Sequence, residues 1–73
     1  MAELKYVVSP KMAGRARAIR GSSFEDAALI YLEEFHPQAD RAGQVMLIVR
    51  QAESGREQCF RIDVVSGRTG PCN

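Results

Sequence analysis

The 73-residue sequence is poor in the residues that build metal centres and covalent active sites. It contains one His and two widely separated Cys, with no Cys-x-x-Cys motif, whereas a metal site usually needs several such ligands at short recurring spacings. The nucleophile and base of covalent catalysis can come only from Cys59 and His36. No Gly-x-Gly-x-x-Gly motif or phosphate-binding loop occurs. These absences predict a protein that is not an enzyme and needs no metal or cofactor.

Long apolar runs are missing as well. The longest are Ala27–Leu32 and Val45–Val49, far short of the roughly 20 residues of a membrane-spanning helix. The first residues lack the charged start, apolar stretch and small-residue cleavage site of an export signal. We therefore predict a cytoplasmic protein. In a reducing cytosol Cys59 and Cys72 are expected as free thiols, and a disulfide between them is the less favoured alternative.

A helix is the strongest local signal in the sequence. Ser22 and Glu25 have the spacing of a capping box, and Pro37 ends the helix near His36. The apolar residues of this segment recur at helical spacing and predict one broad apolar stripe. The residues of the stripe are Phe24, Ala27, Ala28, Tyr31, Leu32 and Phe35.

Segments rich in β-forming residues flank the helix and predict two hairpins. The expected strands are Leu4–Ser9, Arg15–Arg20, Gln44–Gln51 and Glu57–Val65. The order ββαββ predicts an α+β fold with a four-stranded antiparallel sheet in the spatial order 2-1-3-4 and the helix packed on one face. A third strand that is apolar on both faces suits a central position. Residues 1–65 are expected to form a single domain, and residues 66–73 a flexible C-terminal tail.

One helix can cover only one face of such a sheet. Either Val45, Leu47 and Val49 face the helix, or Met46 and Ile48 do, and the other set points away. Exposed apolar side chains are costly, at roughly 25 cal/mol per Å². The sequence therefore predicts a protein-interaction module that uses the free face, with Met46 and Ile48 at the interface and a second copy as the simplest partner. The alternative is that the tail or residues 37–43 fold over this face.

The charges are strongly segregated along the chain. Residues 1–21 carry five basic residues and one acidic residue, whereas residues 22–40 carry five acidic residues and neither Lys nor Arg. The candidate anion contacts are Lys11, Arg15, Arg17 and Arg20. They make a nucleic-acid-associated role the alternative function, although aromatic residues for base stacking are absent from this strip. An edge strand kept soluble by charge, or Arg paired with the acidic helix, explains the same residues structurally.

The start of the helix resembles a known family. Residues 21–27 read Gly-Ser-Ser-Phe-Glu-Asp-Ala, which is similar to the helix start of HicB-type antitoxin domains. The resemblance implies a small partner-binding protein that neutralises a toxin. That family places three strands before its helix and one after it, whereas two and two are expected here.

Overall fold

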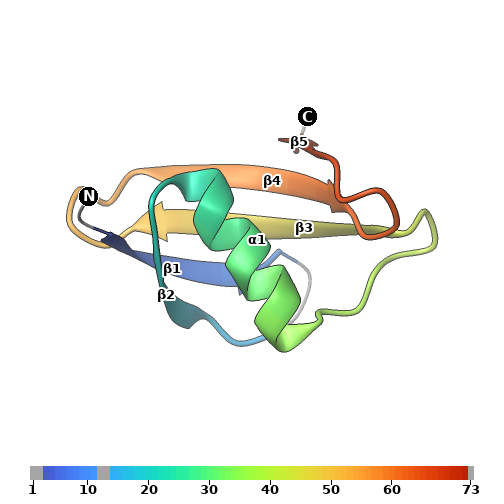
Figure 1. Cartoon of the computed structure of the whole chain (residues 1–73), viewed down its shortest axis with the longest axis horizontal. Coiled ribbons are helices and arrows are strands. Elements are labelled where there is room, and N and C mark those ends of the chain that lie inside the picture. The colour runs from blue at the N-terminus through green and yellow to red at the C-terminus, as the bar shows by residue number, and fades with distance from the viewer. Residues whose placement is uncertain (1–2, 12–13, 73) are drawn as a thin grey trace.

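The computed structural model describes residues 3–11 and 14–72 as an α+β fold (Figure 1). The elements are β1 (Leu4–Pro10), β2 (Arg17–Gly21), α1 (Phe24–Phe35), β3 (Gln44–Gln51), β4 (Glu57–Asp63) and β5 (Thr69–Pro71). The strands form one antiparallel sheet in the order β2-β1-β3-β4-β5, and α1 crosses one face. The predicted fold class, the central position of β3 and the order of the first four strands are confirmed.

Three of the four predicted strands have different boundaries in the structure, and β1 and β2 each end one residue later than predicted, at Pro10 and Gly21. β2 begins at Arg17 rather than Arg15, so Arg15 and Ala16 lie outside the ladder. β4 ends at Asp63 rather than Val65 because the Asp63 carboxylate accepts hydrogen bonds from the N–H groups of Val65 (2.9 Å) and Ser66 (3.1 Å). These bonds turn the chain back immediately after the strand.

The C-terminal segment contains a strand that the sequence does not predict. Residues 66–73 are expected as a loose tail, yet Thr69–Pro71 pair with β4 as β5. Residue 73 lies outside the described residues, as do residues 1–2 and 12–13. The sheet therefore has five strands rather than four.

The helix begins one residue later than the predicted cap. Ser23 is the N-cap: its hydroxyl accepts from the Asp26 N–H at 3.0 Å, and the Asp26 carboxylate accepts from the Ser22 N–H at 2.8 Å. The capping box is thus shifted from Ser22 and Glu25 to Ser23 and Asp26, with the carboxylate reaching the residue before the cap. The helix ends as predicted at His36, whose left-handed backbone (φ 45°) precedes Pro37.

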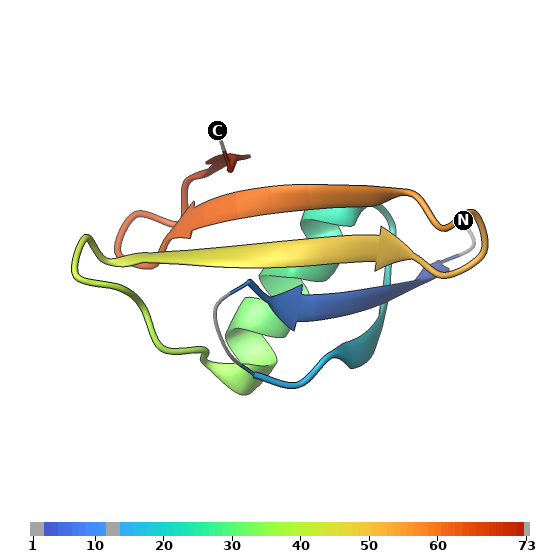
Figure 2. The same ribbon diagram turned by 180° about the vertical axis from the view of Figure 1, so that it is seen from behind.

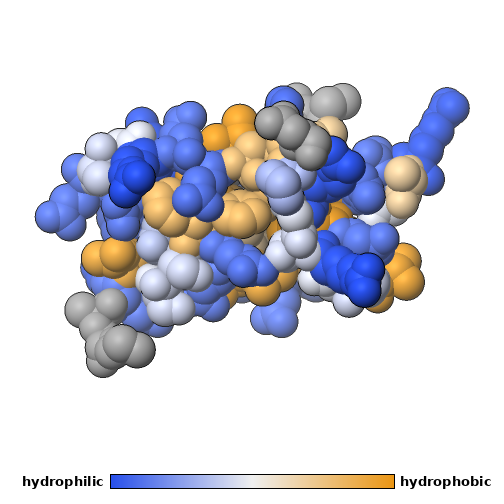
Figure 3. Space-filling model, turned by 90° about the horizontal axis from the view of Figure 1, so that it is seen from above, coloured by the Kyte–Doolittle hydropathy of each residue, from blue (hydrophilic) through white to orange (hydrophobic). Residues whose placement is uncertain are grey.

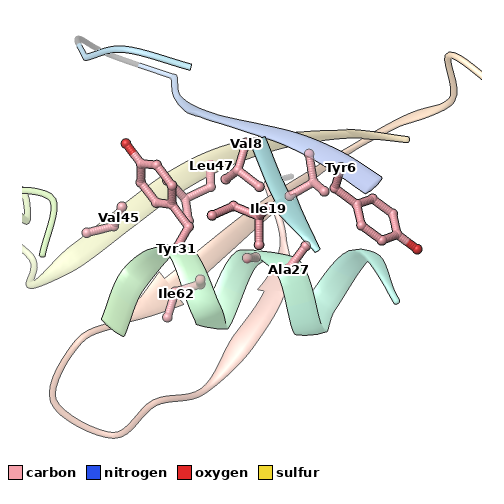
Figure 4. Close-up of a cluster of buried hydrophobic side chains, with 10 residues drawn as sticks. Tyr6, Val8, Ile19, Ala27, Tyr31, Val45, Leu47 and Ile62 are labelled. Atoms are coloured by element: carbon pink, nitrogen blue, oxygen red, sulfur yellow. The ribbon is translucent and has the colours of Figure 1, made fainter. Parts of the chain in front are cut away.

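The core fills the layer between α1 and the sheet (Figure 4). Its buried side chains come from every element except β5; they are Tyr6, Val8, Ile19, Ala27, Ala28, Tyr31, Val45, Leu47, Val49 and Ile62. A side chain at Gly21 would place its Cβ 3.2 Å from the Ala27 backbone nitrogen. Glycine at this position therefore lets the start of the helix lie close to β2.

Within the described residues, no helix combines the length and the apolar character needed to cross a membrane.

Candidate functional site: the free face of the sheet

The side of the sheet that α1 leaves open is termed the free face. Val45, Leu47 and Val49 point into the core, so the alternating residues Met46 and Ile48 point away from the helix. The register extends this assignment to the neighbouring strands, because directly paired residues share a face: Ser9 and Cys59 both lie opposite Ile48. Figure 2 shows β1, β3 and β4 in front of the helix on this side.

Neither predicted cover lies over the free face in the described part of the chain. β5 continues the sheet beside β4 instead of folding across it. In the loop after α1, Ala39 packs against the core on the helix side. The Asp40 carboxylate accepts from the N–H groups of Ala42 and Gln44, both at 2.9 Å, which holds this loop in a local turn.

Apolar side chains form a strip along the middle of the free face. Val7, Met46, Ile48 and Cys59 occupy adjoining positions on β1, β3 and β4, and each is half-buried. Figure 3 views the molecule from above, towards the edge of the sheet formed by β4 and β5, where pale-orange apolar side chains lie among blue hydrophilic ones. On the free face itself, the exposed side chains of Lys5 and Arg50 border the strip beside Val7.

The total surface is larger than expected for a protein of this mass. An 8.1 kDa monomer has an expected surface of about 4,500 Å², whereas this chain exposes 5182 Å². The free face, which no described element covers, contributes to this exposed surface.

Basic side chains flank the apolar strip. Lys5 lies directly opposite Arg20, and Arg50 pairs with Val7 one step along β1. Lys5, Arg20 and Arg50 are exposed, and like charges directly opposite each other destabilise a sheet. Arg61 lies opposite Met46, and Lys11 continues the ladder through its N–H, which donates to the Met46 carbonyl at 2.9 Å.

Acidic side chains are fewer on this face. Glu57 lies opposite Arg50, and Asp63, at the end of β4, is bonded to its own turn. The acidic residues of α1, among them Glu25, Glu33 and Glu34, lie on the opposite layer of the molecule. The two layers thus carry opposite charge, basic on the free face and acidic on the helix.

The predicted anion contacts do not gather at one place. Arg20 and Lys11 lie towards opposite ends of the free face, and Arg15 lies before β2. Arg17 is on the helix side, with its guanidinium carbon 4.8 Å from the centre of the Phe35 ring. Arg50 and Arg61 are the free-face cations that strand-by-strand reasoning missed, and the β1–β3–β4 register is the signal that groups them with Lys5.

The two cysteines form a disulfide, which corrects the expectation of free thiols. Cys59 on β4 and Cys72, just after β5, have Cα atoms 5.5 Å apart, and their bond lies on the free face. The sequence cannot place them because the strand that carries Cys72 to the β4 edge is the unpredicted one. His36 ends α1 on the other layer, so the structure does not bring it to Cys59.

The chain matches one protein-family model over residues 4–73, described as a family of unknown function, DUF5961. No curated protein and no solved structure matches the chain. The match spans nearly the whole sequence, and the chain therefore belongs to the DUF5961 family.

Proposed function

We propose that the chain, a member of a family of unknown function, is a non-enzymatic protein-interaction module. Its free face binds a protein surface that combines apolar and acidic side chains. The observation that supports this proposal is the apolar strip of Val7, Met46 and Ile48 with Lys5, Arg20, Arg50 and Arg61 around it.

Each part of the free face indicates the chemistry of the partner. Burial of the strip favours contact with apolar side chains, and the surrounding cations attract carboxylates and repel basic surfaces. Lys5 and Arg20 lie directly opposite each other and repel. A carboxylate bound between them relieves this repulsion, which favours binding of an anion at this pair.

A second copy of the chain is the partner that the sequence favours, and the homodimer stays a prediction. Packing two free faces together brings the cations of one copy near those of the other. Such a dimer becomes tighter as salt rises, because salt screens the repulsion. Binding to an acidic partner becomes weaker under the same change.

The solution mass separates these two partners. We would measure it by light scattering over a dilution series at low and high salt. A monomer at both salt concentrations supports an acidic partner. A dimer that strengthens with salt, and that is lost in Ile48→Glu but kept in the turn variant Val65→Glu, replaces that proposal with the homodimer.

Binding to an acidic partner is tested with two amphipathic peptides that differ only in Glu or Gln on the polar face. We expect the Glu peptide alone to shift the amide resonances of β1, β3 and β4, with an affinity that falls as salt rises. Reversing the charge of Lys5 and Arg50 together to Glu should abolish binding, whereas reversing Arg41 and Arg56 in the loops should not. Equal binding of both peptides, or binding of neither, would contradict the proposal.

Nucleic acid is the second candidate, favoured by one observation. The acidic helix lies on the far layer, where it does not block a polyanion from the basic free face. The aromatic residues of the strands weaken this candidate, because Tyr6 and Phe60 pack on the helix side and leave the free face without a stacking platform. Salt-sensitive binding of a single-stranded homopolymer, lost on Lys5→Glu with Arg20→Glu, supports it, and no binding at low salt excludes it.

A further inference from the structure

The Cys59–Cys72 disulfide joins the last strand to the rest of the sheet. β5 contains only Thr69–Pro71, and these residues are half-buried or exposed. The disulfide lies at the end of the short ladder, one residue beyond the pairing of Phe60 with Pro71. It is the covalent link between β4 and the end of the described chain.

The non-covalent contacts that hold β5 are few. The Arg61 guanidinium donates to the Cys72 carbonyl at 2.8 Å, and the Thr69 hydroxyl donates to the Glu25 carboxylate. An open hollow of about 450 Å³ lies beside the β4–β5 pair and is lined in part by Gln58, Phe60 and Thr69. A strand of three residues, none of them fully buried, is marginal by itself.

We propose that the Cys59–Cys72 disulfide is a redox-exchange site whose reduction releases β5 and uncovers the outer edge of β4. A dithiol attacks one sulfur as a thiolate, the Cys59–Cys72 bond breaks, and a mixed disulfide forms. The second thiol of the reductant then closes its own disulfide and frees the protein sulfur. Two electrons pass to the protein, each cysteine gains a proton, and the reductant becomes oxidised.

The neighbourhood of the disulfide favours this exchange. Both cysteines are only half-buried, so a reductant can reach them from the free face. When Cys59 is attacked, negative charge develops on the sulfur of Cys72, the residue whose carbonyl accepts a hydrogen bond from the Arg61 guanidinium at 2.8 Å. A nearby cation stabilises a thiolate.

Whether this disulfide is formed depends on whether the protein is in an oxidising or a reducing compartment. In an oxidising compartment β5 stays attached, and in a reducing one it is released. The cytoplasmic location predicted from the sequence stays a prediction, and it corresponds to the released state.

Amide hydrogen exchange tests the proposal within one strand. The Asp63 N–H donates to the Arg68 carbonyl at 2.9 Å, so Asp63 points its amide towards the C-terminal segment. Alternation along the strand makes the Arg61 amide point the same way and the Ile62 amide point towards β3. Arg61 is therefore the readout and Ile62 its internal control.

We expect dithiothreitol to speed exchange at Arg61 by at least about tenfold and to leave Ile62 unchanged, as local opening requires. The double variant Cys59→Ser, Cys72→Ser should show the fast Arg61 exchange without reductant and no response to it. The proposal is overturned if Arg61 stays protected after complete reduction. It is also overturned if Arg61 and Ile62 accelerate together, because the disulfide then stabilises the whole domain rather than β5.

Discussion

Arg17 acts in the structure as a packing residue rather than as an anion contact. Its guanidinium stacks on Phe35, which is 41% exposed at the end of α1. The residue thus ties the edge strand to the last turn of the helix. The sequence places Arg17 on a basic strip, but only the packing of α1 against β2 shows that its charge lies over a ring.

Removing the contact between Arg17 and Phe35 should lower the free energy of unfolding by a small amount. We expect Arg17→Ala to lower the free energy of unfolding by about 0.5–1 kcal/mol, the usual worth of an exposed cation–π pair. Urea unfolding measures the change. Arg20→Ala is the matched control on the free face of the same strand, and it should be neutral or slightly stabilising because it relieves repulsion with Lys5. Equal losses in the two variants would contradict this assignment.

Asp63, at the end of β4, makes the stability of the fold depend on pH in the acidic range. The N–H groups of Ser66 and Val65 donate to its carboxylate and hold the pKa of Asp63 below its ordinary value of 3.8. A carboxyl group whose pKa is lowered by folding stabilises the fold at pH values above 3.8, and this contribution is lost as the pH falls through the folded pKa.

We expect Asp63→Asn to flatten the acid limb of the stability profile, because asparagine keeps an acceptor oxygen but cannot titrate in this range. Denaturant unfolding of both proteins at neutral pH and at a series of acidic pH values measures this effect. An unchanged pH dependence in the variant would show that other carboxyl groups dominate acid unfolding.

At the scale of elements, two adjacent serines are alternative N-caps for α1. Both Ser22 and Ser23 have an acidic residue three positions later, so local chemistry allows either as the cap. In the structure Ser23 is the cap: its hydroxyl accepts from the Asp26 N–H at 3.0 Å, and the Asp26 carboxylate accepts from the Ser22 N–H at 2.8 Å.

This choice is testable with a matched pair of substitutions. Ser23→Ala should cost about 1 kcal/mol, the usual loss for an N-cap. Ser22→Ala should cost less, since its hydroxyl makes only a 3.2 Å bond to Asp26 while its backbone N–H keeps the shorter bond. Thermal or urea unfolding gives both values, and a larger loss at Ser22 would restore the predicted cap.

The strands differ in how well the sequence alone predicts them. The run Val45–Val49 identifies the central strand because a strand buried on one face and half-buried on the other is apolar throughout. Thr69–Pro71 carries no such signal, since Gly and Pro are both depleted in strands. The disulfide and the Thr69–Glu25 hydrogen bond join it to distant parts of the chain, and such contacts leave no local pattern in the sequence. Alternation predicts that Met46 and Ile48 lie on the same face of β3. The position of α1 shows that this face is the one turned away from the helix.

For the whole molecule, adjacent residues on β3 should contribute very differently to the free energy of unfolding. Leu47 is completely buried, and Ile48 is half-buried on the free face. Leu47→Ala should cost about 2–5 kcal/mol through the cavity it leaves, a large part of the marginal stability of a domain this small. Ile48→Ala, measured in the same urea unfolding series, should cost about 1 kcal/mol or less at a half-exposed site. Similar losses would mean that the free face is covered in solution.

The central position of β3 has a consequence for how the protein is made. β1 pairs on one side with β2, its neighbour in sequence, but on the other side with β3, where Val8 lies opposite Val49. As the chain leaves the ribosome, the first hairpin and the helix appear before the strand that joins them to β4. The sheet cannot close until β3 has emerged, so the apolar faces of the first hairpin and of the helix stay exposed to solvent until then.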